Sequence, residues 1–223
     1  MFVEQLKVAL DQYHLLKHPF YNKWNEGALN RDIIRDYAEQ YHHHVEAFPR
    51  YISRTHSMCK DIEKRKILLE NLNEEESQDH DHPKLWWQFA QSLGAADVNE
   101  SKPEAFTQAM IDNFFHWANQ GYAEGLGALY TYERQVPEIA AVKIDGLKQF
   151  YGVTDEAGLK FFEVHRQADQ EHRQQCEALL ADLSPEDQAK AQKAAVETAK
   201  HLWGFLSGIS KKHQISTDEL PIQ

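Results

Sequence analysis

The stretch FEVHRQADQEHRQQCEALL, residues 162–180, is typical of an uninterrupted amphipathic helix, and it indicates both a fold class and a candidate site. It places His165, Asp169 and His172 at offsets of four and seven residues. At roughly 100° per residue, these three side chains lie within about 40° of one another on one helix face. Such a face is either exposed to solvent or part of a site, and the spacing alone leaves both interpretations open.

The rest of the chain repeats the helical pattern. Apolar residues recur at three- and four-residue steps, and no segment shows sustained alternation of β-branched residues, so we predict an all-α fold. The expected helices span residues 2–17, 30–57 with a bend at Pro49, 61–79, 83–94, 103–119, 121–150 with a bend at Pro137, 155–182 and 185–208. Short loops without a flexible linker predict a single helical domain over residues 1–210 and a polar C-terminal tail over residues 211–223.

The composition restricts the classes of function. A formal net charge of −11 argues against nucleic acid or an anionic membrane surface as the main partner, since both require a basic surface. Two cysteines, Cys59 and Cys176, indicate neither a disulfide framework nor a thiolate zinc site. Thirteen histidines instead favour nitrogen and oxygen ligands, which suit iron or manganese. Because no uncharged run approaches a membrane span and no signal-peptide cleavage site follows the N-terminus, we expect a cytoplasmic protein.

A second candidate motif is NLNEEESQDHDHPKLWW, residues 71–87. Glu75 and His82 are seven residues apart, and Pro83 disfavours helical geometry at His82. We therefore expect His82 on the turn that enters the next helix, oriented independently of the helix that carries Glu75. The alternative is an acidic helix end exposed to solvent, because three consecutive glutamates usually face water.

A third candidate is Glu133 in GYAEGLGALYTYERQVPEIAAVKIDGL, residues 121–147. Pro137 cannot donate a hydrogen bond to the Glu133 carbonyl, so the helix should bend there. A carboxylate in an apolar stretch is costly to bury unless it is paired or binds a metal. The neighbouring glycines either let another helix approach closely or leave room for a ligand.

Together these motifs offer three carboxylates and three imidazoles, a set that suits two metal ions roughly 3.5–4 Å apart between helices. The set is Glu75, His82, Glu133, His165, Asp169 and His172. A competing, ferritin-like site would use Glu39 and His42 of AEQYHHH with Asp169, His172 and Glu133. It ranks second, because three consecutive histidines point in different directions and are more often exposed to solvent.

With these residues, the sequence resembles the heme-oxygenase-like diiron oxidases, most closely the branch that contains the chlamydial protein associating with death domains. The resemblance covers nearly the whole chain, through LLKHPFYNKWNEGAL, YHHHVEAFPRYISRTHS, LLENLNEEE, ALYTYERQVPEIAAVKIDGL, HRQADQEH and LWGFLSG. It implies a multi-helix bundle in which all six candidate residues bind metal. The segment ESQDHD lacks the glycine often found in the family, and His80 is therefore a rival to His82.

The same resemblance implies a self-sacrificing enzyme that makes p-aminobenzoate, a folate precursor. A tyrosine of the protein would supply the ring and a lysine the amino nitrogen, while two transition-metal ions, Fe/Fe or Mn/Fe, activate dioxygen. The matching residues are Tyr21 in HPFYNKW as the ring donor, Tyr132 as a nearby redox tyrosine, and Lys143 as the nitrogen donor. The alternative for Tyr21 is a packed aromatic residue, and for Lys143 an ordinary surface lysine.

The expected partners are dioxygen and an external reductant, and a homodimer stays open. One alternative function is an oxidase of the pyrroloquinoline-quinone synthase type that acts on an external substrate. A thiaminase II, which depends on an active-site cysteine, ranks low because Cys59 and Cys176 both lie outside the predicted bent central helix. A third alternative is a non-enzymatic module that binds death domains, and metal content would distinguish it from an oxidase.

Overall fold

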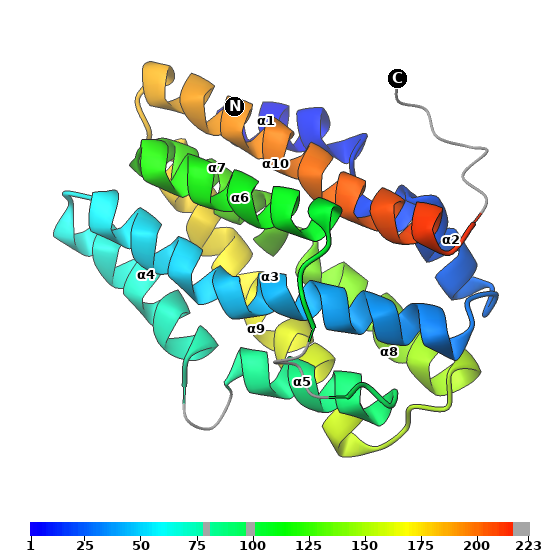
Figure 1. The fold of residues 1–223 in the computed structure, drawn as a ribbon. Coiled ribbons are helices and arrows are strands. Elements are labelled where there is room, and N and C mark those ends of the chain that lie inside the picture. The colour runs from blue at the N-terminus through cyan, green and yellow to red at the C-terminus, as the bar shows by residue number, and fades with distance from the viewer. Residues whose placement is uncertain (78–80, 97–100, 216–223) are drawn as a thin grey trace.

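The computed structural model describes residues 1–77, 81–96 and 101–215, and for residues 167–171 it describes the backbone alone. Over these ranges the chain forms α-helices, one short 3-10 helix (η1) and no strand, which confirms the all-α prediction (Figure 1). The elements are α1 (Phe2–Asp11), η1 (Leu15–Lys17), α2 (Pro19–Asn25), α3 (Arg31–Met58), α4 (Ile62–Glu75), α5 (His82–Ser92), α6 (Ala105–Gln120), α7 (Tyr122–Glu133), α8 (Val136–Phe150), α9 (Glu156–Ala181) and α10 (Pro185–Lys212).

Helix α9, which carries the opening sequence motif, lies at the centre of the contacts that build the site. It packs against α8, α5, α7 and α4, while α3 packs against α4, α5, α6 and α7 (Figure 1). On the other side, α10 packs against α7 and α6. The ends of α4, α5 and α7 and one face of α9 are therefore brought toward a common region of the bundle.

The predicted helix over residues 121–150 is two helices. Helix α7 ends at Glu133, and α8 begins at Val136 with Pro137 in its first turn, where a missing N–H is tolerated. The chain therefore breaks between Glu133 and Val136 rather than bending at Pro137. This break leaves the Glu133 side chain at the last position of α7.

The predicted helix over residues 2–17 was too long, because α1 already ends at Asp11. The sequence prediction missed α2, which begins at Pro19. His18 caps this helix, because its side chain accepts a hydrogen bond of 3.0 Å from the Phe20 N–H. This short helix buries Tyr21, whose side chain is 1% exposed. At the other end of the chain, α10 continues to Lys212, and none of the described helices combines the length and apolar character needed to cross a membrane.

Close approach between α7 and α10 requires glycine at position 127. A Cβ atom built on Gly127 would lie 2.2 Å from the carbonyl oxygen of Ala191, on a backbone that cannot rotate away. Ala191, Ala194 and Ala195 are fully buried on the facing side of α10. Small residues on both helices thus hold α7, and with it Glu133, at a fixed position in the bundle.

This packing predicts that Gly127→Ala destabilises the protein by about 2 kcal/mol or more, because the added methyl group must push two helix backbones apart. Gly204→Ala on α10 is the matched control, since a methyl group added there would meet no atom within 4 Å. That control should gain up to about 1 kcal/mol from the helix propensity of alanine. Urea denaturation of both variants measures the difference, and equal effects at the two positions would contradict the close-packing argument.

Candidate metal centre

Glu75 and His82 meet in the protein interior although a turn separates them in sequence. Glu75 is the last residue of α4 and His82 the first of α5, directly before Pro83. Their side chains are both buried, and His82 Nδ1 lies 2.7 Å from Glu75 Oε2. Burial opposes protonation of His82, but the nearby Glu75 carboxylate outweighs it and raises the pKa of the imidazole. The acidic helix end is thus internal at Glu75 rather than exposed to solvent.

His165 of α9 completes a group of three ligand-type side chains. Atoms of Glu75, His82 and His165 that can bind a metal all lie within 4.8 Å of one another. The rings of His82 and His165 are 4.3 Å apart, and His165 Nδ1 donates a hydrogen bond of 2.7 Å to the carbonyl oxygen of Phe161. This bond fixes the tautomer, so the Nε2 lone pair of His165 stays available for a metal.

Glu133 and His172 form a second pair beside this group. His172 Nδ1 lies 4.0 Å from Glu133 Oε2, and Asn71 Nδ2 donates to Glu133 Oε1 at 2.9 Å. Glu133 is 2% exposed, and burial raises the pKa of its carboxyl group, an effect that the neighbouring His172 opposes. Glu133 also interacts electrostatically with Glu75 and His82. The pair of Glu133 and His172 is therefore a neighbour of the group formed by Glu75, His82 and His165.

The donor set fits a transition-metal centre. It combines imidazole nitrogens with carboxylate oxygens and lacks thiolates, which is the chemistry that iron and manganese accept. Burial also holds the pKa of His165 well below its ordinary value, so this imidazole is neutral and its nitrogen can bind a cation. Two buried carboxylates need compensating positive charge, and a bound metal ion would supply it.

The remaining candidate ligands differ in what the structure shows. The side chain of Asp169 and the whole of His80 lie outside the described residues, so Asp169 stays a prediction and the choice between His80 and His82 rests on the position of His82. No group of three ligand-type side chains in the described part of the chain includes Glu39 or His42. The His42 ring instead packs against Trp87 in a tilted arrangement, at 5.7 Å between ring centroids.

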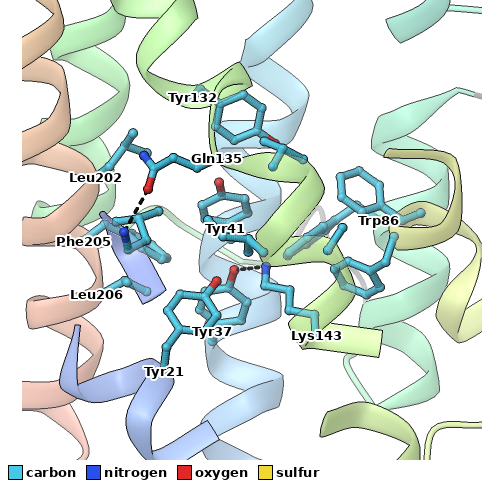
Figure 2. Close-up of a pocket in the computed structure, with 16 residues that line it drawn as sticks. Tyr21, Tyr37, Tyr41, Trp86, Tyr132, Gln135, Lys143, Leu202, Phe205 and Leu206 are labelled. Atoms are coloured by element: carbon cyan, nitrogen blue, oxygen red, sulfur yellow. Dashed lines mark hydrogen bonds between the residues drawn. The ribbon is translucent and has the colours of Figure 1, made fainter. Parts of the chain in front are cut away.

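A small cavity of about 30 Å³ lies next to the candidate metal centre. Its wall includes Phe161, whose ring centroid lies 4.0 Å from that of His165, and Tyr132, which precedes Glu133. Figure 2 shows Tyr21, Tyr37 and Lys143 pointing toward one another at one end of this cavity, with Tyr41 and Tyr132 farther along it. The cavity and the metal-binding candidates therefore share a wall.

Lys143 is buried in this cavity rather than exposed on the surface. Its ammonium position lies 4.8 Å from the Tyr37 ring centroid, 5.0 Å from Trp86 and 5.3 Å from Phe162. No carboxylate lies within 4 Å of Lys143 Nζ in the ranges that the structure describes. Burial lowers the pKa of Lys143 to about 7. At neutral pH, Lys143 is therefore a free amine in about half of the protein molecules.

Two neighbouring sets of side chains line the cavity. Lys143 Nζ and the Tyr37 hydroxyl are 2.5 Å apart in a hydrogen bond, and the Tyr21 side chain points toward Tyr37 (Figure 2). The Tyr41 hydroxyl interacts with Tyr132. The rings of Tyr37 and Tyr41 stack at 5.5 Å, which connects the two sets.

Comparison with known proteins places this architecture in a family. A family model described as "Iron-containing redox enzyme" matches residues 35–204. The chain belongs to this family of iron-containing redox enzymes. Its fold is heme oxygenase-like: it is similar to a domain with that fold from Shewanella denitrificans, with a TM-score of 0.80 and 19% identity over 95% of this chain and 91% of that chain. It is equally similar to a CADD-like protein from Nostoc punctiforme, with a TM-score of 0.80 and 17% identity over 96% and 97% of the two chains.

Curated relatives of this redox enzyme are more similar in sequence. A protein of Chlamydia muridarum named 4-aminobenzoate synthase is 38% identical over 92% of this chain and 88% of its own length. A protein of Nitrosomonas europaea with the same name is 39% identical over 95% of this chain and 92% of its own length. These findings confirm the resemblance to the diiron oxidase branch.

The sequence analysis of this redox enzyme missed several residues of the site. Tyr37 and Tyr41 are separated by four residues on α3, a spacing that is equally typical of an ordinary core stripe. Glu74 was also not considered, although its Oε2 lies 2.9 Å from His172 Nε2. Asn71 could have been noticed as a polar residue one turn before Glu75, but only the structure shows that it contacts Glu133.

The geometry predicts that His165→Ala weakens metal binding at least about tenfold, because it removes one of three converging donors. Glu75→Gln should do the same, since the amide removes the negative charge that balances the metal. Metal analysis of tag-free protein purified without chelators provides the measurement. Glu39→Gln is the control, and loss of metal in that variant with retention in His165→Ala would favour the ferritin-like site instead.

The buried lysine predicts a pH-dependent stability difference. Below pH 7 Lys143 is charged in both the folded and the unfolded state, so the full cost of burying the charge opposes folding. As the pH rises from 7 toward the usual value of 10.5, the folded state is already neutral and this cost disappears. Lys143→Met should therefore raise the free energy of unfolding by ~2–4 kcal/mol at pH 7, and by less at higher pH.

Urea denaturation of metal-free protein at pH 7 and near pH 10 tests this expectation. Lys148→Met is the control, because Lys148 is exposed on the same helix and its replacement should change the free energy of unfolding by less than about 0.5 kcal/mol. An equal gain for Lys143→Met at both pH values would show that the lysine is not buried in its charged form at low pH.

Proposed function

We propose that this chain is an oxygen-dependent oxidase with two metal ions that forms 4-aminobenzoate from its own Tyr21 and Lys143 side chains. The observation that carries the proposal is that these two side chains line one small cavity and are joined through Tyr37. The names of the relatives support the product. The buried group of Glu75, His82 and His165 supports a metal-dependent reaction.

The size of the cavity favours a substrate from the protein itself. A benzene ring needs a cavity on the order of 150 Å³, whereas this one measures about 30 Å³. An external aromatic substrate would have to displace several buried rings, but a small molecule such as dioxygen fits. The same argument disfavours the alternative of an oxidase that acts on an external aromatic substrate.

The residues that would hold the two metal ions, Fe/Fe or Mn/Fe, are Glu75, His82 and His165 in one group and Glu133 and His172 in the other, with Asp169 as a further predicted ligand. Once bound, the metal ions would supply the binding and reduction of dioxygen, with electrons from an external reductant. Phe161 and Tyr132 would separate this chemistry from the cavity and keep water out of it.

The tyrosines would connect the metal centre to the ring that is consumed. Tyr132 lies beside Glu133 and interacts with Tyr41, whose ring stacks on Tyr37. Tyr37 in turn contacts Tyr21 and Lys143. Because phenols are the easiest of the nearby side chains to oxidise, this continuous set would let an electron leave Tyr21 while the ring stays in place.

The proposal predicts that protein reduced with ferrous iron and then exposed to air releases 4-aminobenzoate without an added aromatic compound, with no more than about one product per chain. Mass spectrometry should then find the peptide HPFYNKW altered at Tyr21. Tyr21→Phe should abolish the product but keep the fold and the metal, because the ring volume is nearly unchanged. Tyr13→Phe is the control, since Tyr13 is buried outside the cavity and should keep the wild-type yield.

Isotope labelling identifies the source of each part of the product. Ring-labelled tyrosine should label the ring of 4-aminobenzoate, and lysine labelled with ¹⁵N at the ε position should label its nitrogen. Lys143→Arg keeps a positive charge but lacks a primary amine, so it should stop nitrogen transfer. Unlabelled product from tyrosine-labelled protein would rule out the self-sacrificing reaction.

A further inference from the structure

We propose that Tyr37 is a proton relay between Tyr21 and Lys143, so that oxidation of Tyr21 and protonation of the Lys143 amine occur together. This inference rests on the proposed function and assigns a role to a residue that neither the sequence motifs nor the comparisons single out. It is based on the hydrogen bond between Lys143 and Tyr37 and on the Tyr21 side chain, which points toward the same Tyr37 hydroxyl (Figure 2).

Oxidation of Tyr21 requires a proton acceptor inside the protein. The Tyr21 side chain is 1% exposed and packs against the rings of Phe20 and Trp24, so water cannot take its proton directly. Burial raises the pKa of Tyr21 well above its ordinary value, so the phenol keeps its proton until the electron leaves. A buried cation radical without a base would be strongly destabilised, and the proton must therefore leave with the electron.

Lys143 is the base that the hydrogen bonds make available. The other titratable groups around this end of the cavity are the phenols of Tyr21, Tyr37 and Tyr41, and burial raises the pKa of all three. Across the wall formed by Phe161, His165 interacts electrostatically with Lys143 and has a lowered pKa. Lys143 differs because burial lowers its pKa to about 7, which leaves a free amine that can accept the Tyr37 proton.

The relay step balances in protons and electrons. The Tyr21 O–H bond breaks, its electron passes to the dioxygen-derived oxidant of the proposed function, and its proton moves to the Tyr37 oxygen. The proton of Tyr37 moves at the same time to Lys143 Nζ, so Tyr37 ends as a neutral phenol and Lys143 as an ammonium ion. Four rings surround that ion at 4.8–5.4 Å and stabilise its charge.

The relay also has a consequence for nitrogen transfer. Once Tyr21 has been oxidised, Lys143 holds its proton as an ammonium ion, which has no lone pair. Lys143 must therefore lose this proton again before it can transfer nitrogen to the oxidised ring.

Tyr41 provides a matched control for Tyr37. It lies one turn farther along α3, lines the same cavity and places its ring 5.4 Å from Lys143 Nζ. Its hydroxyl, however, interacts with Tyr132, whereas the hydrogen bond of Lys143 Nζ is to Tyr37. Tyr37→Phe and Tyr41→Phe thus each remove one buried hydroxyl, but only the first interrupts the proposed relay.

The experiment follows the oxidation of Tyr21 after iron-loaded protein meets dioxygen, in H₂O and in D₂O. We expect a solvent isotope effect in wild-type protein, and in Tyr37→Phe an at least tenfold slower oxidation without that isotope effect. Tyr41→Phe should keep the isotope effect whatever its rate. Tyr37→Phe that oxidises Tyr21 at the wild-type rate with the same isotope effect overturns the relay, whereas wild-type protein that never consumes Tyr21 overturns the proposed function and the relay with it.

A second readout needs neither metal nor turnover. In metal-free protein with ¹³C-labelled lysine, NMR should find the Lys143 pKa lower in Tyr37→Phe than in wild type, because the hydrogen bond from the ammonium ion is stronger than the bond to the neutral amine. Tyr41→Phe should titrate like wild type. If Tyr37→Phe does not fold, 3-fluorotyrosine at position 37 keeps the packing but makes the phenol more acidic; an unchanged rate of Tyr21 oxidation in that protein overturns the relay.

Discussion

Two carboxylates, Glu75 and Glu133, lie buried between helices, and the site depends on how their negative charge is balanced. Each is the last residue of its helix, α4 or α7, where the helix dipole is itself negative. The nearest compensating groups are the imidazoles of His82 and His172. A metal ion bound between these side chains would complete the compensation, which explains why polar groups converge in an otherwise apolar bundle.

Helix α9 places this polar centre directly beside an apolar cavity. One turn of the helix contributes Phe161 to the cavity wall, and the next contributes His165 to the metal-binding candidates. Neither region alone explains its own residues: Lys143 has no carboxylate partner among the described residues, and the tyrosines of the cavity are all buried. An oxidant formed at one and consumed at the other accounts for both, because dioxygen chemistry requires a dry space around the groups that react.

Local patterns in the sequence predicted the parts of this arrangement that depend on a single helix. The three- and four-residue periodicity predicted the helices, and Pro137 predicted a disruption near Glu133, which the structure places between α7 and α8. The prediction failed at α2, because a seven-residue helix that begins at Pro19 is too short to show periodicity. That helix is stabilised by burial of Phe20, Tyr21 and Trp24 rather than by its own propensity.

The sequence by itself determined that His165 and His172 share one face of a helix and that Glu133 lies at a helix disruption, because both follow from backbone geometry along the chain. The tertiary structure decided which residues meet. Tyr37 looks like a core aromatic and Lys143 like a surface lysine until α2, α3 and α8 pack together around one cavity. The physical reason is that a pKa, a hydrogen bond or a shared metal depends on neighbours from other helices, and the periodicity of one helix carries no information about them.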